Sequence, residues 1–147
     1  MIFPSPIRVL LAEDHPLVRQ SLRTILQAFP DVLLVGESIT GEEAVLSAGS
    51  LQPHVVLMDI NLPLLDGIAA TRMIKTRYAH IAVIGLTCHM PGDQVYAMTR
   101  AGAFEVLAKE KALDLYEVMQ RAVAGSFRPN GASKSADSTL NVTSLKH

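Results

Sequence analysis

The chain has 147 residues, of which 49% are hydrophobic and 18% are charged. This length suits one domain of about 100–200 residues, and the hydrophobic fraction excludes disorder along the whole chain. The 13 basic and 14 acidic side chains give a net charge of −1, which excludes a protein that recruits nucleic acid by its bulk charge alone. A single cysteine, Cys88, excludes an internal disulfide, and we interpret it as a small buried residue.

The sequence predicts no membrane-spanning helix and no secretory signal. The longest apolar runs are far shorter than the ~20 residues that a spanning helix needs. The N-terminus reads MIFPSP and has no basic segment before its apolar residues. We therefore expect a cytoplasmic protein that does not contact a membrane.

Five short apolar segments are predicted to form strands, and five helical patterns follow them. Several strand candidates are apolar at consecutive positions, which is typical of strands buried on both faces of a parallel sheet. The strands are expected at residues 8–12, 32–37, 55–59, 82–87 and 104–108. Helix signals are Pro16 after Asp14, the Thr40 to Glu43 capping box, Asp66-Gly67, Asp93 with Gly102 as a stop, and an apolar face from about Lys111 to Ala124.

This alternation predicts an α/β fold: a (βα)5 doubly wound parallel sheet with the flavodoxin-like strand order 2-1-3-4-5. Residues 1–127 carry the dense apolar patterning and are expected to form the domain. Residues 128–147 are rich in serine and threonine and are expected to be a flexible linker or tail. In such sheets ligands bind beyond the carboxyl ends of the strands.

Five chemically capable side chains fall at those carboxyl ends. Glu13 and Asp14 follow the first strand, Asp59 ends the third, Thr87 ends the fourth and Lys109 follows the fifth. Three of these side chains also have a plain structural interpretation. Asp14 could cap a helix, Thr87 could be an ordinary strand end and Lys109 could be a solvated loop residue. An aspartate at the tip of a buried strand is costly unless it is paired or metal-bound, so Asp59 is the strongest candidate.

The clustered carboxylates are expected to bind Mg²⁺, which prefers oxygen ligands. Glu13, Asp14, Asp59 and a backbone carbonyl just past Asp59 would supply part of its coordination shell. Such a metal would also bind a phosphoryl group, whose outer oxygens Lys109 and Thr87 could contact. Asp59 could then act as the nucleophile that forms an acyl phosphate.

With these residues in these positions, the sequence resembles the response-regulator receiver domain of two-component signalling. The likeness covers roughly residues 7–126, and its motifs occur in the expected order on five elements. The stretch AEDHPLVRQSL and the non-proline after Lys109 look most like the NarL/FixJ-like subgroup, which usually carries a C-terminal helix-turn-helix DNA-binding domain. The matching residues are Glu13-Asp14, Asp59 in VVLMDINLPLLDG, Pro63, Asp66-Gly67, Thr87 and Lys109 in GAFEVLAKE.

The resemblance implies that Asp59 accepts a phosphoryl group from the phosphohistidine of a sensor histidine kinase or phosphotransfer protein. Asp14, Glu13, Asp59 and the Asn61 carbonyl would hold Mg²⁺. Thr87 would be the hydroxyl that moves toward the phosphate, and Lys109 would pair with the phosphate and with Asp59.

Three positions depart from the family pattern. Val106 stands where relatives usually carry an aromatic switch residue, so aromatic–threonine coupling cannot operate in its usual form. Cys88 replaces a usually small residue after Thr87, and Glu110 replaces the proline that many relatives carry after Lys109. The resemblance implies that phosphoryl acceptance survives all three changes, whereas the first removes the usual route of signal propagation.

We therefore predict a phosphoacceptor switch, regulating transcription, whose phosphorylation changes partner or dimer contacts, and not an enzyme with its own substrate. The alternative is the N-terminal fragment of a helix-turn-helix transcription regulator, and this chain itself is expected to bind no nucleic acid. A flavin-binding domain is disfavoured by the anionic loop at Glu13-Asp14, and a dehalogenase-type phosphatase by Asn61 in place of a second acid. The five histidines are scattered without metal-ligand spacing.

Overall fold

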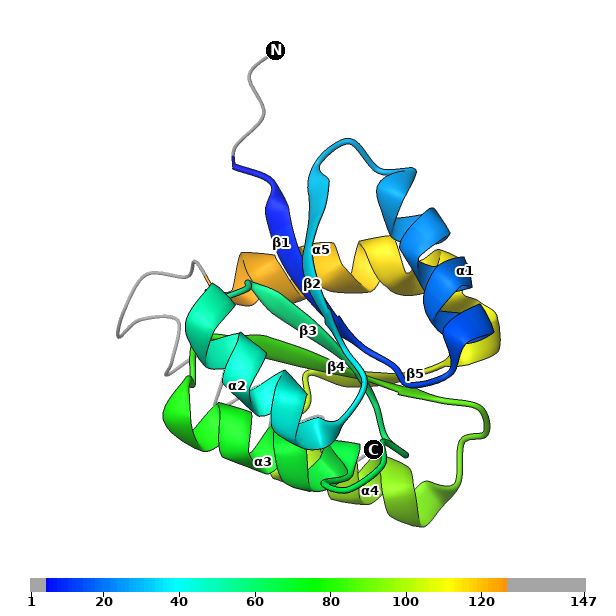
Figure 1. Cartoon of the computed structure of the whole chain (residues 1–147), viewed down its shortest axis with the longest axis vertical. Coiled ribbons are helices and arrows are strands. Elements are labelled where there is room, and N and C mark those ends of the chain that lie inside the picture. Colours follow the sequence, from blue (N-terminus) through cyan, green and yellow to red (C-terminus); the bar gives the residue numbers. More distant parts are fainter. Residues whose placement is uncertain (1–4, 127–147) are drawn as a thin grey trace, which may run out of the picture.

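A computed structural model describes residues 5–126 of the chain as a five-stranded parallel sheet covered by helices on both faces (Figure 1). The strand order is β2-β1-β3-β4-β5, which confirms the predicted doubly wound topology. The strands are β1 (Ile7–Ala12), β2 (Val32–Ser38), β3 (Val55–Asp59), β4 (Ala82–Thr87) and β5 (Glu105–Ala108).

Helices cover both faces of the sheet, as Figure 1 shows. On one side, α1 and α5 pack against the sheet through a cluster that includes Leu22, Leu26 and Leu115. On the other side, α2, α3 and α4 bury a second cluster with Ile74 and Met98. The helices are α1 (Pro16–Gln27), α2 (Gly41–Leu51), α3 (Gly67–Arg77), α4 (Gly92–Ala101) and α5 (Leu115–Ser126), with a short 3₁₀ helix η1 (Lys109–Asp114) before α5.

The continuous apolar runs of the sequence form the central strands. Every residue of β3 and β4 is buried, because helices lie on both faces of the sheet at these positions. Burial on both faces explains why these segments show no alternation of polar and apolar residues. It also means that Asp59, the last residue of β3, is itself buried although it lies at the edge where the strands end.

Most of the expected helix signals are seen in the structure. The Thr40 side chain accepts a hydrogen bond from the backbone N–H of Glu43, and the Glu43 carboxylate accepts one from the N–H of Ile39. Asp66 caps α3 by accepting from the N–H of Ala69 at 2.9 Å. Gly102 ends α4 with a φ of 114°, a left-handed conformation that glycine adopts without strain.

The starts of the last two helices differ from the prediction. The α-helix expected from about Lys111 begins at Leu115, because residues 109–114 form η1 with a non-helical kink at Lys111 (φ −101°, ψ 27°). Helix α4 begins at Gly92, whereas the sequence predicted a helix that follows Asp93, so Asp93 lies in the first turn. The apolar pattern continues through the 3₁₀ turn, since Ala112 packs into the same cluster as α5, so periodicity alone could not find the boundary.

None of the helices among residues 5–126 combines the length and the apolar character needed to cross a membrane. The expected linker, residues 128–147, lies outside the described part of the chain.

Gly67 sits where α3 approaches the end of β3 most closely. A Cβ atom at this position would lie 2.1 Å from the Asp59 carbonyl oxygen and 2.8 Å from the Ile60 Cα. The Gly67 N–H donates a 2.8 Å hydrogen bond to the Ile60 carbonyl, which holds the backbones together. The absent side chain thus allows α3 to pack directly against the backbone that carries Asp59.

Gly67→Ala is expected to destabilise the fold by about 2 kcal/mol or more, because the new methyl group must push backbone aside. Gly92 is a matched control: it also begins a helix, but a Cβ there would meet nothing within 4 Å. Gly92→Ala is expected to change the unfolding free energy by less than about 0.5 kcal/mol. Urea unfolding of the two variants measures both, and equal effects would contradict the close approach at Gly67.

Candidate functional site

The parallel register brings the ends of four strands to one edge of the sheet. Ala12 of β1 pairs with Met58, Asp59 of β3 pairs with Leu86, and Thr87 of β4 pairs with Ala108. The residues that follow these pairs therefore emerge side by side. This register places Glu13, Asp59, Thr87 and Lys109, four of the predicted site residues, at neighbouring positions.

Lys109 joins two buried carboxylates. Its Nζ lies 2.8 Å from Glu13 Oε1 and 3.4 Å from Asp59 Oδ2, and its side chain is only 11% exposed. The Glu13 side chain is fully buried. Lys109 is therefore not a solvated loop lysine, which the sequence had left open. Removing its charge would leave two carboxylates buried without a counter-ion, which is costly.

Burial and the neighbouring charge of Glu13 raise the pKa of Asp59 above its ordinary value. The Asn61 N–H, which donates to Asp59 Oδ1 at 3.1 Å, and the Lys109 ammonium oppose this rise but do not cancel it. Ionising Asp59 thus costs the folded protein free energy.

The pKa of Lys109 is raised as well. Burial by itself would lower it, but the hydrogen bond to Glu13 and the charges of Asp59 and Glu13 outweigh burial. The lysine is therefore held firmly in its ammonium form, and the edge carries one fixed positive charge among its carboxylates.

Asp14 does not cap α1. His15 occupies the N-cap position, and no side chain there accepts a hydrogen bond from the helix. The Oδ1 atom of Asp14 is buried, yet it accepts no hydrogen bond from any residue in the described range 5–126. A buried acceptor oxygen without a hydrogen-bond donor is energetically unfavourable, and a bound cation would satisfy it.

Thr87 is 2% exposed and ends β4 beside this group. Asn61 is exposed just beyond β3, and the amide of Gln94 lies 3.4 Å from its side-chain oxygen. The interpretation of Cys88 as a buried residue is wrong: it is exposed, because β4 ends at Thr87 and the next residue leaves the sheet.

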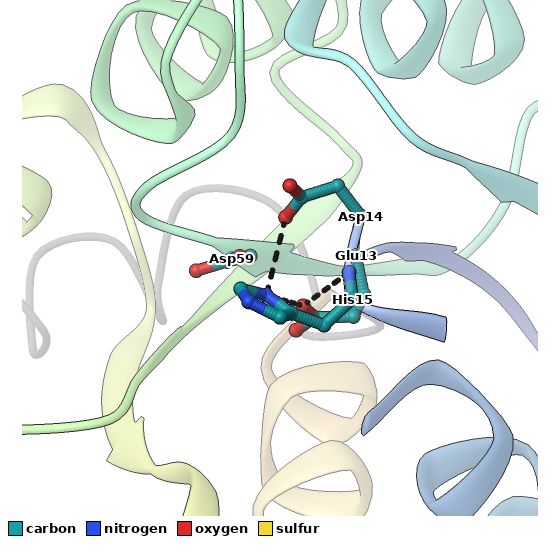
Figure 2. Close-up of side chains that lie close together, drawn as sticks. All are labelled: Glu13, Asp14, His15 and Asp59. Carbon is teal, nitrogen blue, oxygen red and sulfur yellow. Dashed lines mark hydrogen bonds and ion pairs between the residues drawn. The ribbon is translucent and has the colours of Figure 1, made fainter. Parts of the chain in front are cut away.

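His15 completes a compact group that sequence spacing did not reveal. One ligand atom from each of Glu13, Asp14, His15 and Asp59 can be chosen so that all four lie within 4.8 Å of one another. Figure 2 shows the imidazole beside the Glu13 and Asp14 carboxylates, with Asp59 close to the ring. The only signal in the sequence was the position of His15 directly after Glu13-Asp14, because Asp59 comes from an element distant in the chain.

A family model described as the response regulator receiver domain matches residues 9–120. The match covers most of the chain and all of the strand ends that form the site. The chain therefore belongs to the family of response regulator receiver domains, as the motif resemblance implied.

Curated relatives place this domain within longer proteins. The transcriptional regulatory protein LiaR of Bacillus subtilis is 38% identical over 92% of this chain and 64% of its own length. A protein-glutamate methylesterase/protein-glutamine glutaminase of Myxococcus xanthus is 41% identical over 71% of this chain but only 30% of its own length. The chain thus spans between about a third and two thirds of these relatives. The signal receiver domain of the putative response regulator NarL from Mycobacterium tuberculosis superposes with a TM-score of 0.75 at 25% identity, covering 84% of this chain and 98% of that one, which agrees with the subgroup that the motifs suggested.

Solved structures show the same fold. A LuxR-family two-component response regulator from Aurantimonas superposes with a TM-score of 0.78 at 27% identity, covering 92% of this chain and 99% of that one. The receiver domain of the sensor histidine kinase PA1611 from Pseudomonas aeruginosa gives a TM-score of 0.73 at 28% identity, covering 82% and 99%. The second structure holds a magnesium ion coordinated in its active-site cleft.

The raised pKa of Asp59 predicts that metal-free Asp59→Asn is more stable than the wild type at neutral pH. A carboxyl group whose pKa is raised on folding contributes stability at low pH, and this contribution is lost as the pH rises through its folded-state pKa. The gain from Asn should therefore grow from about pH 4, near the ordinary aspartate pKa, toward neutrality.

Urea unfolding in EDTA at several pH values measures this difference. Asp93→Asn serves as the control, because Asp93 is exposed and outside the cluster, and its effect should stay within about 0.5 kcal/mol. A stability loss for Asp59→Asn at neutral pH would show that the Lys109 pair outweighs the burial of Asp59.

Proposed function

We propose that the chain is a phosphoacceptor switch in which Asp59 receives a phosphoryl group from a sensor histidine kinase or phosphotransfer protein. One observation carries this proposal: Asp59 ends a fully buried strand at a sheet edge where Lys109 and two further carboxylates converge. That arrangement combines a nucleophile, a fixed positive charge and a cation-binding group within a few ångströms. The same positions match the receiver motif residue by residue.

The transfer step needs an ionised Asp59. A carboxylate oxygen attacks the phosphorus of the donor phosphohistidine, an O–P bond forms, and the P–N bond breaks with its electron pair leaving on the imidazole, which takes up a proton. Lys109, held in its ammonium form, would neutralise charge on the transferred group, and Thr87 would donate its hydroxyl hydrogen to a phosphoryl oxygen.

The residues of the site fit a magnesium ion. Glu13, Asp14 and Asp59 bring carboxylate oxygens together, and Asp14 Oδ1 is a buried acceptor that receives no hydrogen bond from residues 5–126. We assign these three side chains and the Asn61 carbonyl as the protein ligands. When bound, the ion would neutralise the phosphoryl oxygens and offset the carboxylate repulsion that raises the pKa of Asp59. The magnesium described for the PA1611 receiver domain supports this assignment.

Signal output would follow from the change of charge at Asp59. A phosphoryl group adds about −1.5 to −2 charges, enough to bias a two-state equilibrium of the neighbouring loops. Val106, at the position of the usual aromatic switch, is 9% exposed and packs in the same cluster as Met98 of α4. A small buried residue cannot swing between inward and outward rotamers, so the aromatic route is not available to this chain.

The wider role proposed is regulation of transcription through changed partner or homodimer contacts. The relative LiaR is named a transcriptional regulatory protein, and this supports the alternative that the chain is the N-terminal part of a helix-turn-helix regulator. The matched part of the methylesterase relative is 30% of that protein, and we propose no enzymatic activity beyond self-catalysed phosphotransfer and dephosphorylation for this domain. We expect a cytoplasmic location and no direct binding of nucleic acid by the receiver domain.

Incubation with acetyl phosphate and Mg²⁺ is expected to add about 80 Da, the mass of one phosphoryl group, to the intact wild-type protein. Asp59→Asn removes the attacking carboxylate and should show no such species, whereas Asp93→Asn should keep it. Intact-mass spectrometry without acid treatment reads the result. A wild type that stays unmodified, or an Asp59→Asn variant that gains the same mass, would contradict the assignment of Asp59.

Magnesium is expected to stabilise the wild type against urea in a saturable manner, by about 2.7 kcal/mol when its concentration reaches one hundred times Kd. Asp14→Asn should lose most of this effect, because it replaces an anionic ligand with a neutral amide. Sodium chloride at matched ionic strength provides the control for screening. Equal stabilisation by the two salts would show that the acidic group does not bind the ion.

A further inference from the structure

The described part of the chain places one imidazole within the acidic group at the sheet edge. His15 Nδ1 lies 3.5 Å from Glu13 Oε2 and 3.7 Å from Asp14 Oδ1. Of these two oxygens, Asp14 Oδ1 is the buried acceptor without a hydrogen-bond donor. A nitrogen ligand atom therefore faces the same unsatisfied oxygen that a cation would contact (Figure 2).

The His15 side chain has no competing structural task in the described fold. It occupies the N-cap position of α1 without making a side-chain capping bond. Its backbone N–H is already held by Glu13 Oε2 at 3.2 Å, so the loop position does not depend on the ring. The side chain is 69% exposed, which leaves it room to turn toward an ion without disturbing the core.

We propose that the edge is a mixed nitrogen–oxygen site for a first-row transition-metal ion of the Co²⁺, Ni²⁺ or Zn²⁺ class, with His15 Nδ1 as one ligand beside the Asp14 and Asp59 carboxylates. The proposal rests on the cation site proposed above and extends it to a second class of ion. Magnesium gains little from an imidazole because it prefers oxygen, whereas imidazole nitrogen is a strong ligand for the later divalent ions.

The distances suit such an ion after small side-chain movements. Ligand atoms around a tetrahedral zinc-class ion with bonds of about 2.1 Å lie about 3.4 Å from one another. The four candidate ligand atoms already lie within 4.8 Å of one another. Because both classes of ion would use the same carboxylates, their binding is mutually exclusive, and His15 sets the preference between them.

Isothermal titration of the full chain with Co²⁺, and separately with Mg²⁺, tests this preference. His15→Ala is expected to weaken Co²⁺ binding by about tenfold or more while changing Mg²⁺ binding by less than about twofold. Asp14→Asn should weaken both ions, as expected for a shared site. His89→Ala is the matched control, since His89 is an exposed histidine outside the group and should leave both affinities unchanged.

Three results would overturn the proposal. The first is an unchanged Co²⁺ affinity in His15→Ala, and the second is an equal loss of affinity for both ions in this variant, which would mean that His15 only shapes the loop. The third is a loss of Co²⁺ affinity in His89→Ala instead. Phosphorylation of His15→Ala by acetyl phosphate with Mg²⁺, read by intact mass, separates this inference from the proposed function. If that variant is phosphorylated and binds Co²⁺ like the wild type, only the role of His15 fails. If the wild type neither binds Mg²⁺ nor accepts the phosphoryl group, the proposed function fails.

Discussion

The contact of Lys109 with Glu13 and Asp59 is the interaction on which the rest of the site depends. One ammonium group, 11% exposed, lies between two carboxylates that are almost completely buried. In a region of low dielectric constant the two carboxylates repel each other, and they are tolerable only while the ammonium group neutralises part of their charge. The contact also joins three segments distant in the chain, since Glu13 follows β1, Asp59 ends β3 and Lys109 follows β5.

The fold creates this contact by a simple geometric rule and holds it at some cost. The carboxyl ends of parallel strands lie at one edge of the sheet, and the helices on both faces exclude water from the central strands. Burial, together with the charge of Glu13, raises the pKa of Asp59, so the residue that we propose as the nucleophile also opposes folding when it is ionised. A bound cation would stabilise a site of this kind by offsetting the repulsion between its carboxylates. The buried Oδ1 of Asp14, which accepts no hydrogen bond from residues 5–126, marks the position where positive charge is lacking.

The fold was largely predictable because local patterns and tertiary structure agree. Apolar runs that end at Asp59 and Thr87 indicated strands at 55–59 and 82–87 that are buried on both faces, and both are observed with those bounds. The capping signals at Thr40 and Asp66 correspond to hydrogen bonds that are made. The start of α5 was misplaced because the 3₁₀ turn before it buries Ala112 on the same face, so the apolar spacing does not change at the boundary.

The sequence by itself determined which side chains stand at strand ends, because a strand's last residue is marked by where its apolar run stops. It therefore predicted Glu13, Asp14, Asp59, Thr87 and Lys109 as candidates. Only the tertiary structure decided their relations: that Lys109 pairs with buried carboxylates, that Asp14 does not cap α1, that Cys88 is exposed and that His15 faces the acidic group. These depend on register, on the packing between strands and on the direction in which the chain leaves the sheet. None of these is encoded by the spacing of residues within one segment.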